Sequence, residues 1–273
     1  MAEQKGKYLH GFDQAEQKRL YRQAEFAEYL IFQDINFSDC KHLLEVGCGV
    51  GAQTGILLRR FPKIHVTGID LSEKQLASAR KHLEQLPYAK GRYELHCMDA
   101  GNMEFDTDFF SGAFVCWTLE HIPKPLQVLT EIRRVLRPGG QVVITEVMNS
   151  SFFLDPYSPN LLKYLMAFND YLYESGGDPF VGAKLGNFLL KAGYQDVNTN
   201  IKTWHLDSRS PGKRKEGIKE RRELLLSAQQ RLINAGGIDK DVVENMKKEL
   251  EQVLNNPDAV LFDAFFQAKA VIY

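Results

Sequence analysis

Residues 42–51 read His42-Leu43-Leu44-Glu45-Val46-Gly47-Cys48-Gly49-Val50-Gly51, a short apolar run that passes directly into a glycine-rich turn. Three glycines at alternate positions carry no Cβ that would hold a ligand away from the main chain, and glycine tolerates the positive φ angles of a tight turn. A helix is predicted over residues 52–60, and its free N-terminal N–H groups favour a negatively charged group. The pattern therefore predicts a strand, a turn and a helix that bind a nucleotide-like cofactor.

A second strand is predicted over residues 64–70 and ends at Asp70. This acid lies about 20 residues beyond the glycines, where nucleotide-binding α/β sheets use a carboxylate to bind ribose hydroxyls. Further apolar runs predict three more strands, which alternate with two helices. These strands are expected at 92–97, 112–117 and 141–147, and the helices at 72–85, which Ser72 caps, and 125–136. The alternation predicts an α/β fold with a doubly wound, mostly parallel sheet that binds ligands at the carboxyl ends of its strands.

Beyond residue 148 the pattern changes. An aromatic, partly helical segment is followed by a helix at 182–192, a strand near 197–205, a charged helical insertion and a last strand within 261–273. Pairing of the last two strands would make the end of a seven-stranded sheet antiparallel. We expect four regions: an N-terminal helical lid at 1–36, the cofactor-binding core at 37–148, a substrate insertion at 149–181, and at 182–273 the end of the sheet with a helical insertion at about 208–256.

Composition excludes several classes of protein. The chain has 273 residues, a formal net charge of -1 and four cysteines, which show no spacing typical of metal ligands. No apolar run is long enough to cross a bilayer, and residues 1–7 do not resemble a signal peptide. Basic residues cluster at 209–222, but interleaved glutamates favour a solvated helical face over nucleic-acid binding, which stays a minor alternative. We expect a cytoplasmic monomer or homodimer without a metal or a membrane span.

Five motifs in order carry a resemblance to a known family. They are Leu43-Leu44-Glu45-Val46-Gly47-Cys48-Gly49-Val50-Gly51, Gly68-Ile69-Asp70, Met98-Asp99-Ala100, Leu119-Glu120-His121-Ile122 and Leu136-Arg137-Pro138-Gly139-Gly140. Together they resemble class I S-adenosylmethionine-dependent methyltransferases, which have a Rossmann-like fold, and within that group the small-molecule branch that includes ubiquinone and menaquinone methyltransferases. The resemblance covers mainly residues 43–147, with weaker similarity at 8–23 and in the last two strands.

The resemblance implies S-adenosylmethionine as cofactor and a role for each matching residue. The glycines would admit the methionine part, Asp70 would bind the ribose, and Asp99 would accept from the adenine amino group. The implied cofactor-binding residues are Tyr8, Arg19, Gln23, Glu45, Gly47, Gly49, Gly51, Asp70, Leu71, Asp99, Ala100, Trp117 and Thr118. Trp117 equally fits a core position, because large aromatic side chains usually pack in the interior.

The expected reaction is in-line transfer of a methyl group to a small, apolar or aromatic molecule. His121 is the first candidate for a catalytic base, although a histidine after a strand is often only a hydrogen-bonded loop residue. The expected substrate-binding residues are Glu146, Phe153, Tyr157 and Tyr171, mainly from the aromatic segment. Two alternatives remain open: an NAD-dependent oxidoreductase, because Gly47-x-Gly49-x-x-Ala52 also fits a dinucleotide fingerprint, and a non-catalytic cofactor-binding protein.

Overall fold

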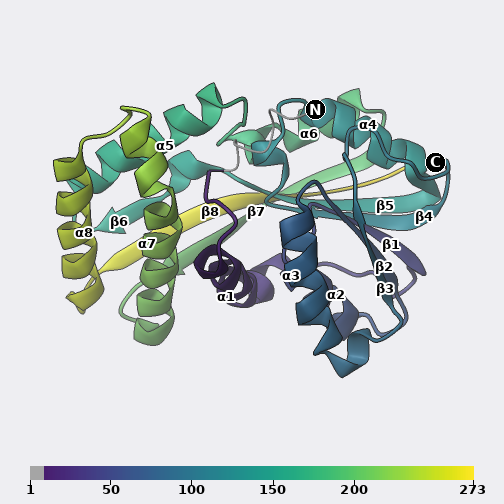
Figure 1. Ribbon diagram of the computed structural model, residues 1–273, viewed down its shortest axis with the longest axis horizontal. Helices are drawn as coiled ribbons and strands as arrows, with labels where there is room; N and C mark the ends of the chain where they lie inside the picture. The colour runs from purple at the N-terminus through teal and green to yellow at the C-terminus, as the bar shows by residue number, and fades with distance from the viewer. Residues whose placement is uncertain (1–8) are drawn as a thin grey trace.

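The computed structural model describes residues 9–273, which form one mixed sheet with helices on both faces (Figure 1). The strands within the described residues are β1 His42–Val46, β2 His65–Asp70, β3 Tyr93–Cys97, β4 Phe110–Cys116, β5 Leu136–Val147, β6 Phe153–Asp155, β7 Gln195–Leu206 and β8 Val260–Val271. The α-helices are α1 Gln14–Ile31, α2 Ala52–Arg60, α3 Glu73–Glu84, α4 Pro125–Val135, α5 Pro159–Glu174, α6 Leu185–Lys191, α7 Pro211–Asn234 and α8 Lys240–Asn255. Short 3₁₀ helices are η2 Pro87–Ala89, η3 Leu119–His121, η4 Asn149–Ser151 and η5 Val181–Lys184.

The strand order is β3-β2-β1-β4-β5-β8-β6, and β7 pairs with β8 as well. The first five strands run parallel, whereas β8 is antiparallel to β5, β6 and β7. The chain moves outward from β1 to β3 and then returns to add β4 on the other side of β1. Such a reversal leaves a crevice at the carboxyl ends of β1 and β4, which is where ligands bind in open α/β sheets.

The predicted α/β fold with a mostly parallel sheet is confirmed, but the predicted number of strands was wrong. The described residues contain eight strands instead of seven, because the three-residue β6 pairs with the start of β8, with Phe153 opposite Phe262. A strand of three residues is too short to show the period-two alternation that marks a strand in sequence. β8 also lies inside the sheet between β5 and β7, which pairs it on both sides over most of its length.

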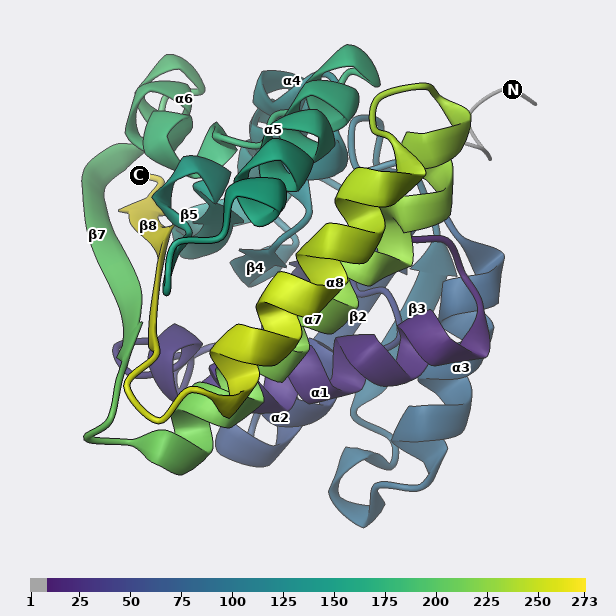
Figure 2. The ribbon, with the colours of Figure 1, turned by 90° about the vertical axis from the view of Figure 1, so that its left-hand side faces the viewer.

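Helices α4 and α6 cover one face of the sheet, and α1, α2 and α3 lie on the other (Figure 1). Helices α5, α7 and α8 pack together beyond the end of the sheet where β5 finishes and β8 begins (Figure 1). Helix α1 runs alongside α7, so the N-terminal helix and the helical insertion meet over the carboxyl ends of the parallel strands (Figure 2). This arrangement closes a space between the insertion and the sheet.

Local sequence explains where the helices begin. Asp13 accepts the N–H of Glu16 at 2.8 Å and caps α1, and Ser72 caps α3 as the sequence predicted. Helix α2 differs, since it follows Gly51 in a left-handed conformation and has no side-chain cap. Its first N–H groups therefore remain available beside the glycine turn. Among residues 9–273, no helix has both the length and the apolar character needed to cross a membrane.

Candidate functional site

The three glycines of the turn differ in what surrounds them. Gly47, Gly49 and Gly51 have φ angles of 71°, 52° and 76°, a region that disfavours other residues. A Cβ at Gly47 would lie 2.4 Å from the Thr118 side chain, and one at Gly51 would lie 3.0 Å from that of Ala79. A Cβ at Gly49 would meet no atom of the described residues 9–273 within 4 Å. Packing inside the protein therefore explains Gly47 and Gly51, whereas Gly49 borders open space that a ligand can use.

Asp70 holds this turn from the end of β2. Its Oδ2 accepts the N–H of Gly49 at 2.9 Å, and its Oδ1 accepts the N–H of Ser72 at 2.8 Å. A carboxylate offers about four acceptor positions, so roughly two remain for further donors such as ribose hydroxyls. Burial raises the pKa of Asp70, and the two backbone hydrogen bonds oppose that shift. The neighbouring Leu71 is 63% exposed, which leaves an apolar surface beside the carboxylate.

The predicted adenine-binding pair follows β3, the strand next to β2. Asp70 pairs in register with Cys97, so Asp99 and Ala100 lie at the same edge of the sheet as Asp70. Asp99 is exposed, and its Oδ1 accepts the N–H of Gly101 at 2.8 Å. Ala100 is buried in the core. The carboxyl ends of β1, β2 and β3 thus present a glycine turn and two acids along one crevice.

Glu45 lies beneath the glycine turn and connects β1 to α2. Its side chain is buried and accepts a hydrogen bond from the Thr54 hydroxyl at 2.6 Å. Burial raises the pKa of the Glu45 carboxyl to about 8, although the bond from Thr54 opposes the shift. This contact fixes the start of α2 relative to β1.

The turn after β4 is held from the neighbouring strand. Trp117 has a positive φ of 52°, and the N–H groups of Thr118 and Leu119 donate to Oε1 of Glu146 at 2.8 and 2.7 Å. Burial raises the pKa of Glu146 to about 7, against the effect of these backbone bonds. Glu146 is fully buried and lies outside the set of side chains that line the cavity described next. It supports the turn that carries Trp117 and Thr118.

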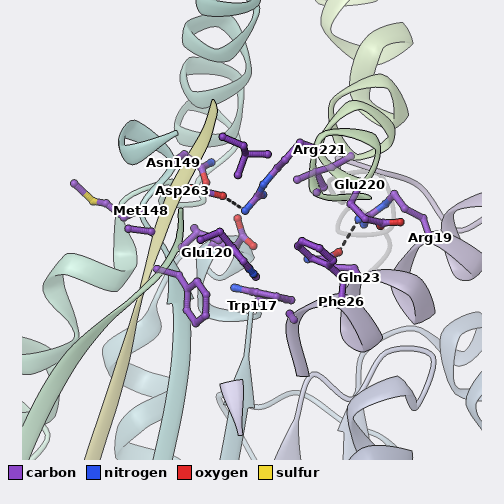
Figure 3. Close-up of a pocket in the computed structure, with 18 of the residues that line it drawn as sticks. Arg19, Gln23, Phe26, Trp117, Glu120, Met148, Asn149, Glu220, Arg221 and Asp263 are labelled. Carbon is purple, nitrogen blue, oxygen red and sulfur yellow. Dashed lines mark hydrogen bonds and ion pairs between the residues drawn. The ribbon is translucent and has the colours of Figure 1, made fainter. Parts of the chain in front are cut away.

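A cavity of about 70 Å³ lies where the insertion meets the sheet (Figure 3). Side chains from α1, the turn after β4, α7, β7 and β8 converge on it. It is lined by His10, Arg19, Gln23, Phe26, Ala27, Trp117, Glu120, Val147, Met148, Asn149, Phe168, Trp204, Gly217, Glu220, Arg221, Leu224, Leu261, Asp263, Ala264 and Phe265. Arg19, Gln23 and Trp117, which were predicted at the cofactor, line this cavity.

Two arginines on the cavity wall already have carboxylate partners. Arg19 donates through Nε and NH2 to Glu16 at 2.7 and 2.6 Å and through NH1 to Gln23 at 2.6 Å. Arg221 forms an ion pair with Asp263 (Figure 3), and its guanidinium lies 5.4 Å from the ring centre of Trp204. Both guanidinium groups are thus held in place by charged neighbours.

The basic cluster at 209–222 is only partly a solvated face. The side chain of Arg214 is 1% exposed and donates to backbone carbonyls of Asn256, Pro257 and Ala259. Arg221 points into the cavity instead of the solvent. The expectation of a uniformly solvated face was therefore wrong for these two residues, because buried acceptors from β8 and the segment before it satisfy their charges.

His121 lies beside the cavity but does not line it. Its Nε2 is 3.7 Å from Oε1 of Glu120, and its ring centre is 6.4 Å from that of His10. His10 in turn contacts the hydroxyl of Ser227 at 2.6 Å. Burial and the charge of Arg19 lower the pKa of His121 to about 4, so the imidazole is neutral near pH 7. The adjacent Glu120, absent from the predicted site, does line the cavity.

The structure does not bring the predicted substrate residues to this cavity. Phe153 and Tyr157 are 51% and 73% exposed, and Tyr171 packs against the main hydrophobic core. Tyr8 lies outside the described residues. Other aromatic side chains line the cavity in their place, namely Phe26, Trp117, Phe168, Trp204 and Phe265. Phe26, Trp204 and Phe265 come from α1, β7 and β8, and no local sequence pattern marks them as neighbours.

Comparison with known proteins agrees with this geometry. Residues 44–144 match a family described as "Methyltransferase domain". The chain is 32% identical over 168 residues to O-methyltransferase cnsE of Penicillium expansum, covering 59% of this chain and 56% of that protein. It is 27% identical over 169 residues to demethylmenaquinone methyltransferase of Tropheryma whipplei, covering 58% of this chain and 68% of the relative.

Among solved structures, the fold resembles phosphoethanolamine N-methyltransferase 2 of Haemonchus contortus, which was solved with S-adenosylhomocysteine. The TM-score is 0.57 at 19% identity, over 91% of this chain and 52% of the other. The chain spans about half the length of several curated relatives that it matches. The matched domain, the ordered motifs and the strand order agree with a methyltransferase domain over residues 44–144 of this chain.

Proposed function

We propose that this chain transfers a methyl group from S-adenosylmethionine to a small apolar or aromatic molecule. The observation that carries the proposal is the juxtaposition of Gly49, which borders open space, with Asp70, whose carboxylate keeps acceptor positions free. A crevice of this kind suits a ligand that combines a charged methionine part with a ribose. The exposed Leu71 and the exposed acid Asp99 suit the adenine ring and its amino group.

The cofactor, when bound, supplies a methyl group that its sulfonium already activates. The chain then has to align the acceptor atom with that methyl group and to exclude water, and alignment can supply about 7–11 kcal/mol of a barrier. Trp117 lines the cavity, and Glu146 accepts hydrogen bonds from the two residues that follow Trp117. The aromatic lining of the cavity supports an acceptor with an apolar or aromatic body.

The N-terminal region supports a lid role, which remains a proposal for residues 1–36. Arg19, Gln23 and Phe26 of α1 form one side of the cavity, and α1 rests against α7. His121 remains a candidate base, but its low pKa makes it a weak proton acceptor near neutral pH. The structure therefore supports alignment as the main contribution of the chain.

Calorimetric titration with S-adenosylmethionine, S-adenosylhomocysteine and NAD tests the proposal. We expect both adenosyl compounds to bind and NAD not to bind. Asp70→Ala should weaken S-adenosylhomocysteine binding about 10- to 100-fold, because hydrogen bonds to a charged group are each worth about 1.5–3 kcal/mol. Asp241→Ala removes an exposed acid from α8 and serves as the control. Binding of NAD alone, or equal affinity in both variants, would contradict the proposal.

A further inference from the structure

We infer that the acceptor substrate presents a protonated amine to the cavity and that Glu120 is the residue that binds it. The inference rests on the proposed function in one respect: it takes the cavity to be the place where the acceptor substrate binds. Glu120 belongs to η3, directly after the turn that carries Trp117, and its side chain points into the cavity (Figure 3). The residue is only 9% exposed, so the cavity is its main opening.

Glu120 has no cationic partner in the described part of the chain. No hydrogen bond to its carboxyl is formed within residues 9–273, and the nearest basic nitrogen is Nε2 of His121 at 3.7 Å. That imidazole is neutral near pH 7, so it does not neutralise a carboxylate. A buried carboxyl group without a partner is costly, and a ligand cation would remove the cost.

The balance of charge around the cavity favours a cation over an anion. The lining contains three acids, Glu120, Glu220 and Asp263, and two arginines. Glu16 and Asp263 already pair with Arg19 and Arg221. Glu220 contacts Arg22 through Oε1, but its buried Oε2 has no partner among the described residues. An anionic substrate would add negative charge to a wall that already carries unpaired carboxyl oxygens.

The other walls also suit an ammonium group. Phe26, Trp117, Phe168, Trp204 and Phe265 present aromatic rings to the cavity, and aromatic faces attract cations within about 6 Å. Arg221 already lies over Trp204 in this way. A cavity of about 70 Å³ is smaller than the usual range of about 300–1,000 Å³ for whole small molecules. It accommodates the amine head of a substrate, with the remainder outside.

Burial and charged neighbours shift the pKa of the Glu120 carboxyl. Burial and the nearby Glu146 of β5 raise its pKa well above the usual range, whereas Arg221 of α7 and Arg19 of α1 act in the opposite direction. His121 on its own turn, Asp263 of β8, Glu220 of α7 and His10 complete the surroundings. An ammonium ion beside Glu120 would favour its carboxylate form, because an opposite charge nearby stabilises the ionised group.

A matched set of probes tests the inference by binding alone. Phenethylamine, 2-phenylethanol and 3-phenylpropionate have similar aromatic bodies with a positive, a neutral and a negative head. We expect the amine to bind the protein saturated with S-adenosylhomocysteine at least about tenfold more tightly than the other two. Equal or tighter binding of the alcohol or the acid would overturn the inference.

Glu120→Gln keeps the shape of the side chain and removes its charge. We expect phenethylamine affinity to fall about 10- to 100-fold, with S-adenosylhomocysteine affinity unchanged. Glu216→Gln removes a charge from the exposed face of α7 and should leave both affinities unchanged. Retained amine affinity in Glu120→Gln would overturn the inference. The comparison of the three probes on the wild-type protein needs no variant. Titration of the amine without S-adenosylhomocysteine separates failure of the amine site from failure of the proposed cofactor.

Discussion

Gly49 differs from the other two glycines of its turn. Among the described residues, only its positive φ angle disfavours a side chain at this position. The contacts at Gly47 and Gly51 explain those residues by internal packing alone. At Gly49, no atom of residues 9–273 lies within 4 Å of the place where a Cβ would be. Together with the neighbouring Asp70, this leaves room for a ligand to approach the main chain.

Gly49→Ala should therefore reduce both stability and cofactor binding. The left-handed φ costs an alanine about 1–2 kcal/mol of unfolding free energy, and the new methyl group should weaken S-adenosylhomocysteine binding at least about tenfold. Gly91 has a φ of 70° and equally open surroundings, but it lies in a turn before β3. Gly91→Ala should cost similar stability and leave binding unchanged. Urea unfolding and calorimetry measure the two effects, and equal binding by both variants would count against a ligand at Gly49.

Glu45 makes stability depend on pH through its raised pKa of about 8. An unfolded glutamate has a pKa of about 4.3, so the folded state holds the proton over a window in which the unfolded state releases it. The protonated Glu45 carboxyl therefore adds its full contribution to the free energy of unfolding below about pH 4.3, and this contribution is lost as the pH rises towards 8. The sign follows from the raised carboxyl pKa and is opposite to that of a salt-bridged acid.

Glu45→Gln removes this titration while keeping an acceptor for Thr54. Between pH 5 and pH 8, the unfolding free energy of the wild type should fall relative to that of the variant by about 1 kcal/mol per pH unit. Urea denaturation at several pH values measures the difference. Parallel pH curves for the two proteins would show that Glu45 is not protonated in the folded state.

Among the elements, the turn after β4 depends on a side chain from the next strand. Glu146→Ala would leave the N–H groups of Thr118 and Leu119 without their acceptor. Each unsatisfied buried donor costs about 1–3 kcal/mol, so the variant should lose about 2–5 kcal/mol of unfolding free energy. Glu146→Gln retains the accepting oxygen and should recover most of the loss. Thermal or urea unfolding compares them, and equal losses in both variants would assign the effect to charge instead.

Sequence patterns predicted elements well where a single element carries the signal. The strands β1 to β5, the helices α2 to α4 and the cap of α3 were expected within a few residues. The strand β6 was missed because three residues carry no periodicity, and β5 begins at Leu136 because the Arg137-Pro138-Gly139-Gly140 segment continues in the strand. The inward orientation of Arg214 and Arg221 was missed because charged residues at helical spacing usually face solvent.

At the scale of the whole molecule, the helical insertion and the sheet share one hydrophobic core. Buried residues run from Leu43 and Val66 in the sheet through Ile31 of α1 to Leu232 and Leu250 of the insertion. The two tryptophans, Trp117 and Trp204, lie where the insertion meets the sheet. A continuous core of this kind predicts that both parts unfold together.

Leu250→Ala should destabilise the entire chain. Leu250 is fully buried in α8, and truncation of a buried leucine costs about 2–5 kcal/mol. Tryptophan fluorescence and far-ultraviolet circular dichroism should shift together in urea, because neither part unfolds first. Leu190→Ala, at a residue 63% exposed, should change stability by less than about 1 kcal/mol. Separate transitions by the two probes would show that the insertion is an independent unit.

The sequence by itself determined the glycine turn and the acids at the carboxyl ends of the parallel strands. Glycines at alternate positions, the acids at the end of β2 and after β3 and the alternation of strands and helices are local features, and the geometry of a parallel sheet brings the carboxyl ends of its strands together. The cavity between the insertion and the sheet was decided only by the tertiary structure. Phe26, Glu120, Trp204, Arg221 and Asp263 come from five separate elements, and they meet because α1 and α7 pack across the ends of β4, β7 and β8. Contacts between distant elements leave no periodic signal in the sequence, so the charge and size of the cavity could not be predicted from the sequence alone.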